Sequence, residues 1–171
     1  TFNGSLFLLP KDCRLTEFTL EGISNIQGDF QCIDYFYVKE FVMPFIRVAG
    51  DMTIALNSGS VNTAAEIEFP KLQEIGGTLT LGTNRNANNI TFPLLKKILG
   101  SCSVTTYELK NDIEFTNLES IGTDGADAQI KFEIEATNIL CPKLKTINGK
   151  FDIATSSFMF DMEVDKVSYP N

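Results

Sequence analysis

Residues 67–81 read Ile-Glu-Phe-Pro-Lys-Leu-Gln-Glu-Ile-Gly-Gly-Thr-Leu-Thr-Leu, and residues 90–104 repeat the same order of apolar, proline and glycine positions. The second half of this unit, an apolar residue followed by a spacer, a glycine and alternating apolar residues, recurs along the whole chain. Its leading positions are spaced by 22 to 27 residues and number seven: Phe2, Ile26, Val48, Ile75, Ile98, Ile121 and Ile147. A repeat of this period predicts a solenoid.

Apolar residues alternate with polar ones after the glycine and again in Ile-x-Phe, so both stretches are expected to be short strands. The proline after Phe69 or Phe92 has no N–H to donate to a strand ladder, and it marks a corner between strands. The recurring glycine is expected either to adopt a positive φ or to let neighbouring coils approach closely. The pattern predicts a mainly β protein, a β-solenoid of about seven rungs with short turns or 3₁₀ segments at its corners.

The domain boundaries follow from where the repeat ends. We expect residues 1–155 to form the solenoid and residues 156–171 to form a C-terminal cap and exit segment. The last rung would otherwise expose unpaired N–H and C=O groups at its strand edges. Four apolar residues of this segment are expected to cover it: Phe158, Met159, Phe160 and Met162. Extra residues are expected in three loops: Asn57–Ala65, Thr83–Asn89 and, where Thr123 replaces the glycine, Thr123–Gln129.

Composition and charge exclude several functional classes. The chain has 14 Lys and Arg residues against 22 Asp and Glu residues, a net charge of −8, which argues against binding to nucleic acid or anionic membranes. No stretch approaches the ~20 apolar residues that span a bilayer, so a signal or anchor is expected outside this segment. Because histidine is absent, the commonest acid–base catalyst and metal ligand is missing, and we expect no cofactor and no metal.

The four cysteines do not form a disulfide framework. Cys32, Cys102 and Cys141 occupy positions where the repeat requires an apolar residue, so they are expected to be buried free thiols. Cys32 and Cys102 lie three rungs apart, about 14 Å at the strand spacing, which exceeds the reach of a disulfide. A bridge between Cys13 and Cys32 is the one pairing that remains open.

Two stretches are candidate binding sites. Tyr35, Phe36 and Tyr37 are consecutive, and because neighbouring side chains of a strand point to opposite faces, at least one is expected to be exposed as an anchor for protein or sugar. The alternative is that these aromatic residues fill a wider core. Asn86 and Asn88 lie in an Asn-rich segment that is predicted either to contact glycan or to supply turn geometry.

Other polar positions have simpler interpretations. Asp124 and Asp127 could donate oxygen ligands to Ca²⁺, yet a calcium site needs six or more ligands, and a solvated turn is the preferred interpretation. Asn3 and Asn89 begin N-glycosylation triplets, which matter only in a secreted eukaryotic protein. Charged residues at spacer positions are expected to point outward as a solvated face: Lys71, Glu74, Lys96, Lys97, Glu119, Lys143 and Lys145.

The recurring Phe-Pro-x-Leu-x-x-Ile-x-Gly-x-Leu-x-Leu resembles the receptor L domain, the leucine-rich-repeat-like β-helix of growth-factor receptor ectodomains. Bacterial leucine-rich surface proteins and fungal cell-wall proteins have similar repeats. The resemblance covers about Phe2 to Ile153, and it implies a right-handed stack of coils used for protein or glycan recognition outside the cell. Because the chain lacks Trp and has no cysteine clusters at its ends, the resemblance favours a microbial surface protein.

These observations predict a non-catalytic recognition or adhesion module at the cell surface, monomeric or part of a multidomain chain, with an unidentified protein or glycan ligand. One alternative is a structural segment of a larger surface protein. Another is a carbohydrate-active β-helix enzyme, which needs two carboxylates roughly 5–10 Å apart across a cleft. Asp51 and Glu74 come nearest to this on neighbouring coils, but on different parts of their rungs, so we expect no enzyme.

Overall fold

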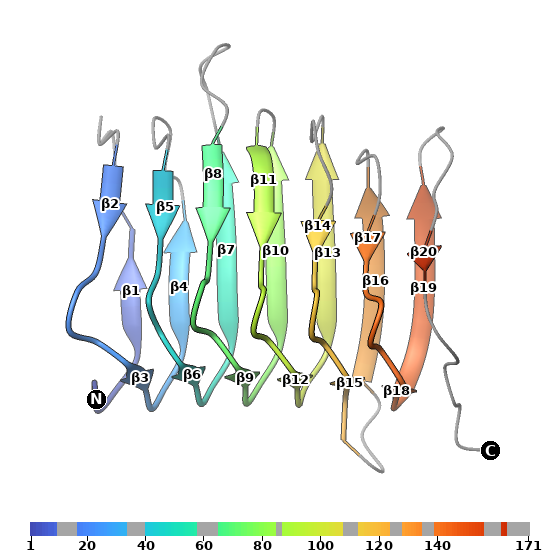
Figure 1. The fold of residues 1–171 in the computed structure, drawn as a ribbon, viewed down its shortest axis with the longest axis horizontal. Coiled ribbons are helices and arrows are strands. Elements are labelled where there is room, and N and C mark those ends of the chain that lie inside the picture. The colour runs from blue at the N-terminus through green and yellow to red at the C-terminus, as the bar shows by residue number, and fades with distance from the viewer. Residues whose placement is uncertain are drawn as a thin grey trace.

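The computed structural model of the chain shows parallel sheets stacked as a β-solenoid (Figure 1). It describes residues 1–9, 17–33, 40–57, 65–84, 87–107, 113–123, 128–134, 139–155 and 162–163. Within these ranges every regular element is a strand and there is no helix. The mainly β solenoid predicted from the repeat is therefore confirmed.

Three parallel sheets run along the stack. The long sheet contains β1 (Leu6–Leu8), β4 (Phe30–Ile33), β7 (Met52–Asn57), β10 (Leu79–Asn84), β13 (Cys102–Tyr107), β16 (Ala128–Ile134) and β19 (Gly149–Thr155). The second sheet contains β2 (Glu17–Thr19), β5 (Glu40–Val42), β8 (Ala65–Glu68), β11 (Ala87–Thr91), β14 (Ile113–Glu114), β17 (Ile139–Leu140) and β20 (Met162–Glu163). The short sheet contains β3 (Asn25–Ile26), β6 (Arg47–Val48), β9 (Glu74–Ile75), β12 (Lys97–Ile98), β15 (Ser120–Ile121) and β18 (Thr146–Ile147).

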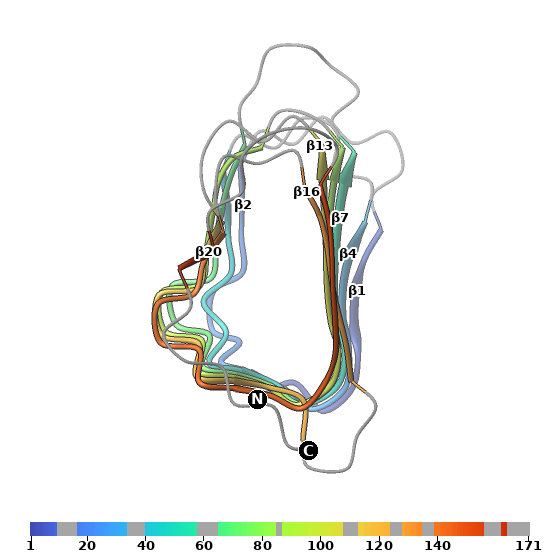
Figure 2. The ribbon, with the colours of Figure 1, turned by 90° about the vertical axis from the view of Figure 1, so that its right-hand side faces the viewer.

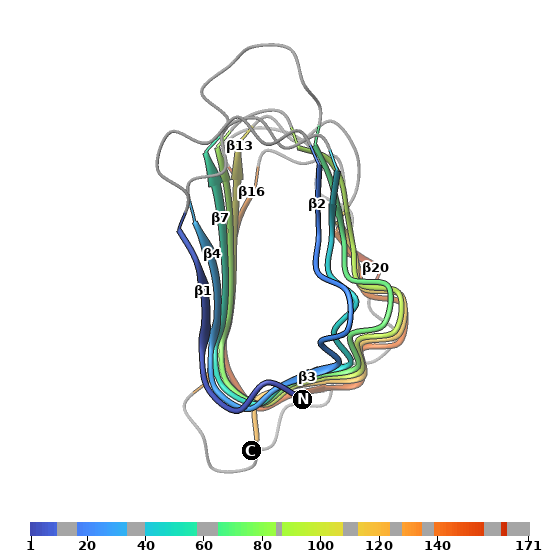
Figure 3. The same cartoon turned by 90° about the vertical axis from the view of Figure 1, so that its left-hand side faces the viewer.

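Each coil passes through the sheets in one order, from the short sheet to the long sheet and then to the second sheet. Figures 2 and 3 look along the stack and show the long sheet facing the second sheet, with the short sheet closing the base. Equal positions of the repeat pair directly, as in Leu79 with Met52 and with Cys102. The register therefore converts a repeat in the sequence into columns of like residues in space.

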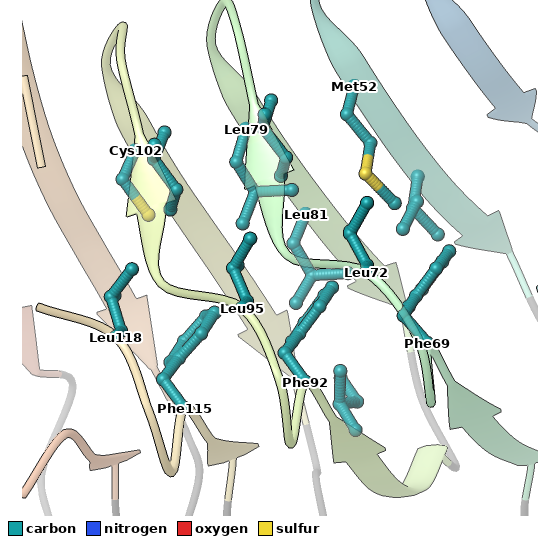
Figure 4. Packing of buried hydrophobic residues seen from close by; sticks show 14 of the residues in the cluster. Met52, Phe69, Leu72, Leu79, Leu81, Phe92, Leu95, Cys102, Phe115 and Leu118 are labelled. Atoms are coloured by element: carbon teal, nitrogen blue, oxygen red, sulfur yellow. The ribbon is translucent and has the colours of Figure 1, made fainter. Parts of the chain in front are cut away.

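Inward columns of apolar side chains make up the core (Figure 4). The short sheet contributes buried Ile26, Val48, Ile75, Ile98, Ile121 and Ile147, and the long sheet contributes Phe30, Met52, Leu79 and Cys102 beside Cys32, Ile54, Leu81 and Val104. No coil buries these side chains alone, because each is covered by the coils on either side. In the first coil, Leu6, Leu8, Leu20 and Ile23 are only partly buried against this core.

The corners after the second sheet are β-turns. The N–H of Leu72 donates to the carbonyl of Phe69 at 3.3 Å, and Leu95 donates to Phe92 at 3.4 Å in the next coil. Pro70 therefore occupies the second position of a turn, where its fixed φ is favourable. Of the two predicted corner types, the described residues contain turns and no 3₁₀ segment.

Close approach accounts for the four middle glycines of the repeat, whereas Gly4 and Gly149 at its two ends have positive φ angles of 152° and 149°. Gly100 donates its N–H to the carbonyl of Gly77 at 2.9 Å, and the same bond joins Gly77 to Gly50 at 2.9 Å and Gly50 to Gly28 at 3.0 Å. None of these four residues is among the glycines with positive φ. The glycines form a backbone ladder along one edge of the stack, where a side chain would separate the coils.

The predicted loops are shorter than the sequence suggested. The segment Thr83–Asn89 is largely strand, because β10 extends to Asn84 and β11 begins at Ala87. Asn57 and Ala65 likewise lie in β7 and β8, and Gln129 lies in β16. The physical reason is lateral pairing: polar residues continue a strand when the neighbouring coil supplies its hydrogen-bond partners.

The coil that begins at Ile121 rejoins the stack after its insertion. Ile130 of β16 pairs with Cys102 on one side and Phe151 on the other, as expected for an alternating stretch that starts late. Of the segment 156–171, Met162 and Glu163 are described, and they extend the second sheet as β20 beside β17. The rest of the expected cap lies outside the described residues.

Candidate functional site

The structure places one of the five residues that the sequence nominated for binding. Tyr35, Phe36, Tyr37 and Asn86 lie outside the described residues. Asn88 lies in β11, where the register shifts: Ala87 pairs with Ala65 and Asn89 with Glu66. Asn88 is therefore the extra residue of a bulge in a strand, and the prediction that it belongs to a loop is wrong.

The two glycosylation triplets differ in their surroundings. Asn3 is exposed, whereas Asn89 is half-buried within β11. The Nδ2 atom of Asn89 donates a hydrogen bond to Oε2 of Glu66 at 2.8 Å. In the folded protein, the atom that would carry a glycan at Asn89 is thus engaged with the neighbouring coil.

A polar ladder that the sequence analysis missed follows the glycine ladder. After Gly4, Gly28 and Gly50, the side chain of the next residue accepts the N–H of its counterpart on the next coil. Asp29 N–H donates to Oγ of Ser5 at 2.9 Å, and Asp51 N–H donates to Oδ1 of Asp29 at 2.9 Å. Thr78 N–H donates to Oδ1 of Asp51 at 2.7 Å. The signal was present in the sequence, since Ser5, Asp29, Asp51, Thr78 and Ser101 directly follow the first five repeat glycines and all carry a side-chain oxygen.

The two carboxylates that came nearest to the acid pair of a carbohydrate-active enzyme, Asp51 and Glu74, both form hydrogen bonds with a neighbouring coil. Asp51 belongs to the polar ladder, and Glu74 accepts a hydrogen bond and ion pair from Nε of Arg47 at 2.8 Å. Across the described residues, no group of three or more His, Cys, Asp and Glu side chains is arranged to hold a metal ion. Nor does any helix long and apolar enough to cross a membrane occur in the described part of the chain.

A line of cations lies on the corner after the second sheet and on the adjacent short sheet. We call it the lysine ridge, and it consists of Arg47, Lys71, Lys96, Lys97, Lys143 and Lys145. The five lysines are exposed, as predicted for spacer positions. Two exposed apolar side chains accompany them, Ile46 at 38% and Leu94 at 42%. The described chain thus presents a charged, chemically mixed surface along one edge of the stack.

Three cysteines are buried free thiols, as predicted. Cys32 is a free thiol, so it does not form the disulfide with Cys13 that the sequence left open. Cys13 itself lies outside the described residues. Burial raises the pKa of Cys32 and of Cys102 far above the ordinary thiol range, and the neighbouring Cys141 raises that of Cys102 further. Burial also raises the pKa of Cys141 to about 12. These thiols stay protonated and inert.

Raising the pH from 7.5 to 9.5 is expected to lower the free energy of unfolding by roughly 1 kcal/mol for each of the three thiols. Below the ordinary thiol pKa of 9.0, both states keep the proton and the full stability is present. Above it, the unfolded chain releases protons that the folded chain retains, so stability falls as pH rises. Denaturant titrations at both pH values measure this. In a Cys102→Ala variant the pH-dependent loss should shrink by about a third, and an unchanged loss would contradict the assignment.

The geometry offers three kinds of surface: the outer face of the long sheet, the bulge at Asn88 and the lysine ridge. Four of the described carboxylates, those of Asp29, Asp51, Glu66 and Glu74, form contacts between coils, and the three described thiols are buried. Comparison of the chain with protein-family models, with curated proteins and with solved structures finds no match.

Proposed function

We propose that this chain is a non-catalytic recognition or adhesion module of a cell-surface protein, acting outside the cell on a protein or glycan ligand. One observation carries the proposal: each coil repeats its inward residues and varies its outward ones. At one inward position the coils repeat a buried phenylalanine: Phe69, Phe92 and Phe115. Two residues further along each coil, the outward position varies: Lys71, Leu94 and Asn117. A regular scaffold with a varied surface is typical of solenoids that bind ligands.

We infer further that the coils number seven and wind in a right-handed sense. Seven leading apolar positions in the sequence and two sheets of seven strands support the number. The handedness rests on the general rule that connections between parallel strands of one sheet are right-handed in about 98% of cases. The resemblance of the repeat to the receptor L domain implies the same handedness and supports an extracellular role.

The non-catalytic part of the proposal rests on how the candidate acid residues are used. A glycosidase needs one carboxylate as proton donor and another as nucleophile or base. Asp51 accepts the N–H of Thr78 and Glu74 pairs with Arg47, so each has a role in joining coils. The chain also has no histidine to act as an acid or base.

A glycan array and a panel of extracellular proteins, combined with a polysaccharide depolymerisation assay, test the proposal. We expect saturable binding to one class of ligand without release of reducing ends. Release of reducing ends that disappears in an Asp51→Asn or Glu74→Gln variant would instead establish an enzyme. If neither the glycan array nor the protein panel contains a ligand that binds, the recognition role is refuted and the role of a structural segment is favoured.

A further inference from the structure

The lysine ridge is a concentration of positive charge on an acidic chain. From the second coil onward, the corners and short strands carry six cations and two anions, Glu74 and Glu119. These segments are residues 44–48, 70–75, 93–98, 116–121 and 142–147. The equivalent part of the first coil adds Glu21 and no cation. The chain as a whole has a net charge of −8, so the ridge has the opposite sign to the rest of the molecule.

Most of the ridge charge is available to a ligand. Glu74 is held by Arg47 at 2.8 Å, which removes one anion and one cation from consideration. Lys143 donates from Nζ to Oδ1 of Asn117 at 2.5 Å, a neutral partner that leaves its charge uncompensated. Among the described residues, Lys71, Lys96, Lys97 and Lys145 have no ion-pair partner. Glu119, the second ridge anion, is exposed and lies on the coil between Lys96 and Lys145, so six cations and two anions leave the ridge a net charge of +4 toward external anions.

The register arranges these cations along the axis of the stack. Gln73, Lys96, Glu119 and Lys145 follow one another from coil to coil, as their backbone bonds show: Lys96 N–H donates to Gln73, Glu119 to Lys96 and Lys145 to Glu119. Because neighbouring coils are about 4.8 Å apart, Lys96 and Lys145 lie about 10 Å apart along the axis. The short strands that carry the ridge are seen side by side along the lower edge of Figure 1.

We propose that the lysine ridge binds a linear anionic polysaccharide, carrying carboxylate or sulfate groups, that lies along the solenoid axis. The inference rests on the recognition role proposed above and assigns it a surface and a ligand class. Lysine supplies a compact, rotatable point charge that suits anionic groups spaced along a flexible chain. Each exposed contact is weak, so binding depends on several of them acting together.

The chemistry of the ridge disfavours the other polyanionic or large partners. Single-stranded nucleic acids need aromatic side chains on which bases stack, and the outward residues of the ridge include none. Tight protein interfaces centre on Trp, Tyr and Arg, whereas the one ridge arginine is occupied by Glu74. Membrane-surface binding needs a broad apolar face in addition to charge, and Ile46 and Leu94 supply two side chains.

Polygalacturonate and dextran sulfate are suitable probes, with neutral dextran as the uncharged control. At about 20 mM salt, where screening is weak, both polyanions should bind the intact chain and dextran should not. The logarithm of the affinity should fall linearly with the logarithm of the salt concentration. Each lysine contact with a flexible polyanion contributes about −0.7 to this slope, so the four lysines without an ion-pair partner predict a slope of roughly −3. The Lys96→Gln/Lys97→Gln variant should bind about ten-fold more weakly, with a slope shallower by roughly 1.

A charge-matched variant locates the effect. Lys131→Gln/Lys150→Gln removes two lysines from β16 and β19 of the long sheet and should leave polyanion binding within about two-fold of the intact chain. The inference is overturned if this variant weakens binding as much as the ridge variant, if neutral dextran binds equally well, or if phosphatidylserine vesicles bind and polygalacturonate does not. If one of these results is found, the ridge variant is tested against any ligand that the intact chain binds on the glycan array or protein panel. Retained binding of that ligand would show that the proposed recognition function stands and uses another surface.

Discussion

Replacing Gly100 by alanine is expected to destabilise the solenoid by about 4 kcal/mol or more, one of the largest effects of any single methyl group in this chain. A Cβ at position 100 would lie 2.6 Å from the carbonyl carbon of Gly77 and 2.8 Å from its oxygen. Both are backbone atoms of the residue to which Gly100 donates its hydrogen bond at 2.9 Å. Overpacking costs about 1–3 kcal/mol where side chains can move aside, and here no side chain is available to move.

The expected consequence extends beyond one contact. To accept the methyl group, the coil of Gly100 must move away from the coil of Gly77, which breaks the ladder bond and opens the packing between Leu79 and Cys102 beside it. Both side chains are fully buried, so a gap between them loses dispersion contacts on both sides. The loss should therefore appear in the free energy of unfolding, measured by denaturant titration.

Gly82→Ala is the matched control, because Gly82 lies in the same repeat region but has room. A Cβ at position 82 would lie 4.0 Å from its nearest neighbours, the Cβ of Ala55 and the carbonyl oxygen of Ile54, which is ordinary van der Waals contact. We expect a change within about 1 kcal/mol, in the stabilising direction if the unfolded chain loses freedom. Equal effects of the two substitutions would contradict the close-approach explanation of the glycine ladder.

The repeat could be recognised in the sequence because parallel, in-register stacking imposes the same burial on equal positions of every coil. Ile75 and Ile98 precede the glycine in sequence and pair directly in space. The sequence left the role of the glycine open, since positive φ and close approach both favour the same residue. Distances between neighbouring coils were needed to decide, because the atom that excludes a side chain at Gly100 belongs to Gly77, 23 residues earlier.

Loop prediction failed where local preference and lateral pairing conflict. The Asn-rich stretch favours turns when considered alone. In the structure, Asn89 pairs with Glu66 and Ile90 pairs with Ile67, so the neighbouring coil holds the segment in β11. The bulge at Asn88 keeps this strand paired although it carries one residue more than its neighbour. A single sequence does not reveal which residues of the next coil are positioned to pair.

The lysine ridge could not be recognised in the sequence, because its residues lie on different coils and are far apart along the chain. Each lysine of the ridge is interpreted as a solvated spacer when considered alone, and that interpretation is correct for its exposure. Lys71, Lys96 and Lys145 become one surface only when the register stacks their coils. Tyr35, Phe36 and Tyr37 lie outside the described residues, so their role as binding anchors stays a prediction.

Phe92→Ala is expected to lower the free energy of unfolding by about 4–5 kcal/mol. Phe92 is fully buried, and its ring lies between those of Phe69 and Phe115 with centroid distances of 5.0 Å to each. The interplanar angles of 3° and 6° describe two parallel stacked pairs, so the substitution removes a whole side chain and two ring contacts at once. Leu94→Ala, two residues away and 42% exposed, should cost less than about 1 kcal/mol in the same titration.

A double-mutant cycle separates the stacking from simple burial. Phe69→Leu and Phe92→Leu each keep an apolar side chain in the column, so the cavity is small and the lost ring contact dominates the coupling. We expect a coupling free energy of about 0.5–1.5 kcal/mol between the two positions, because the ring pair at 5.0 Å is lost in either single variant. Additive effects would mean that Phe69 and Phe92 stabilise the column by buried area alone, and that the parallel stacking follows from the coil spacing without contributing further.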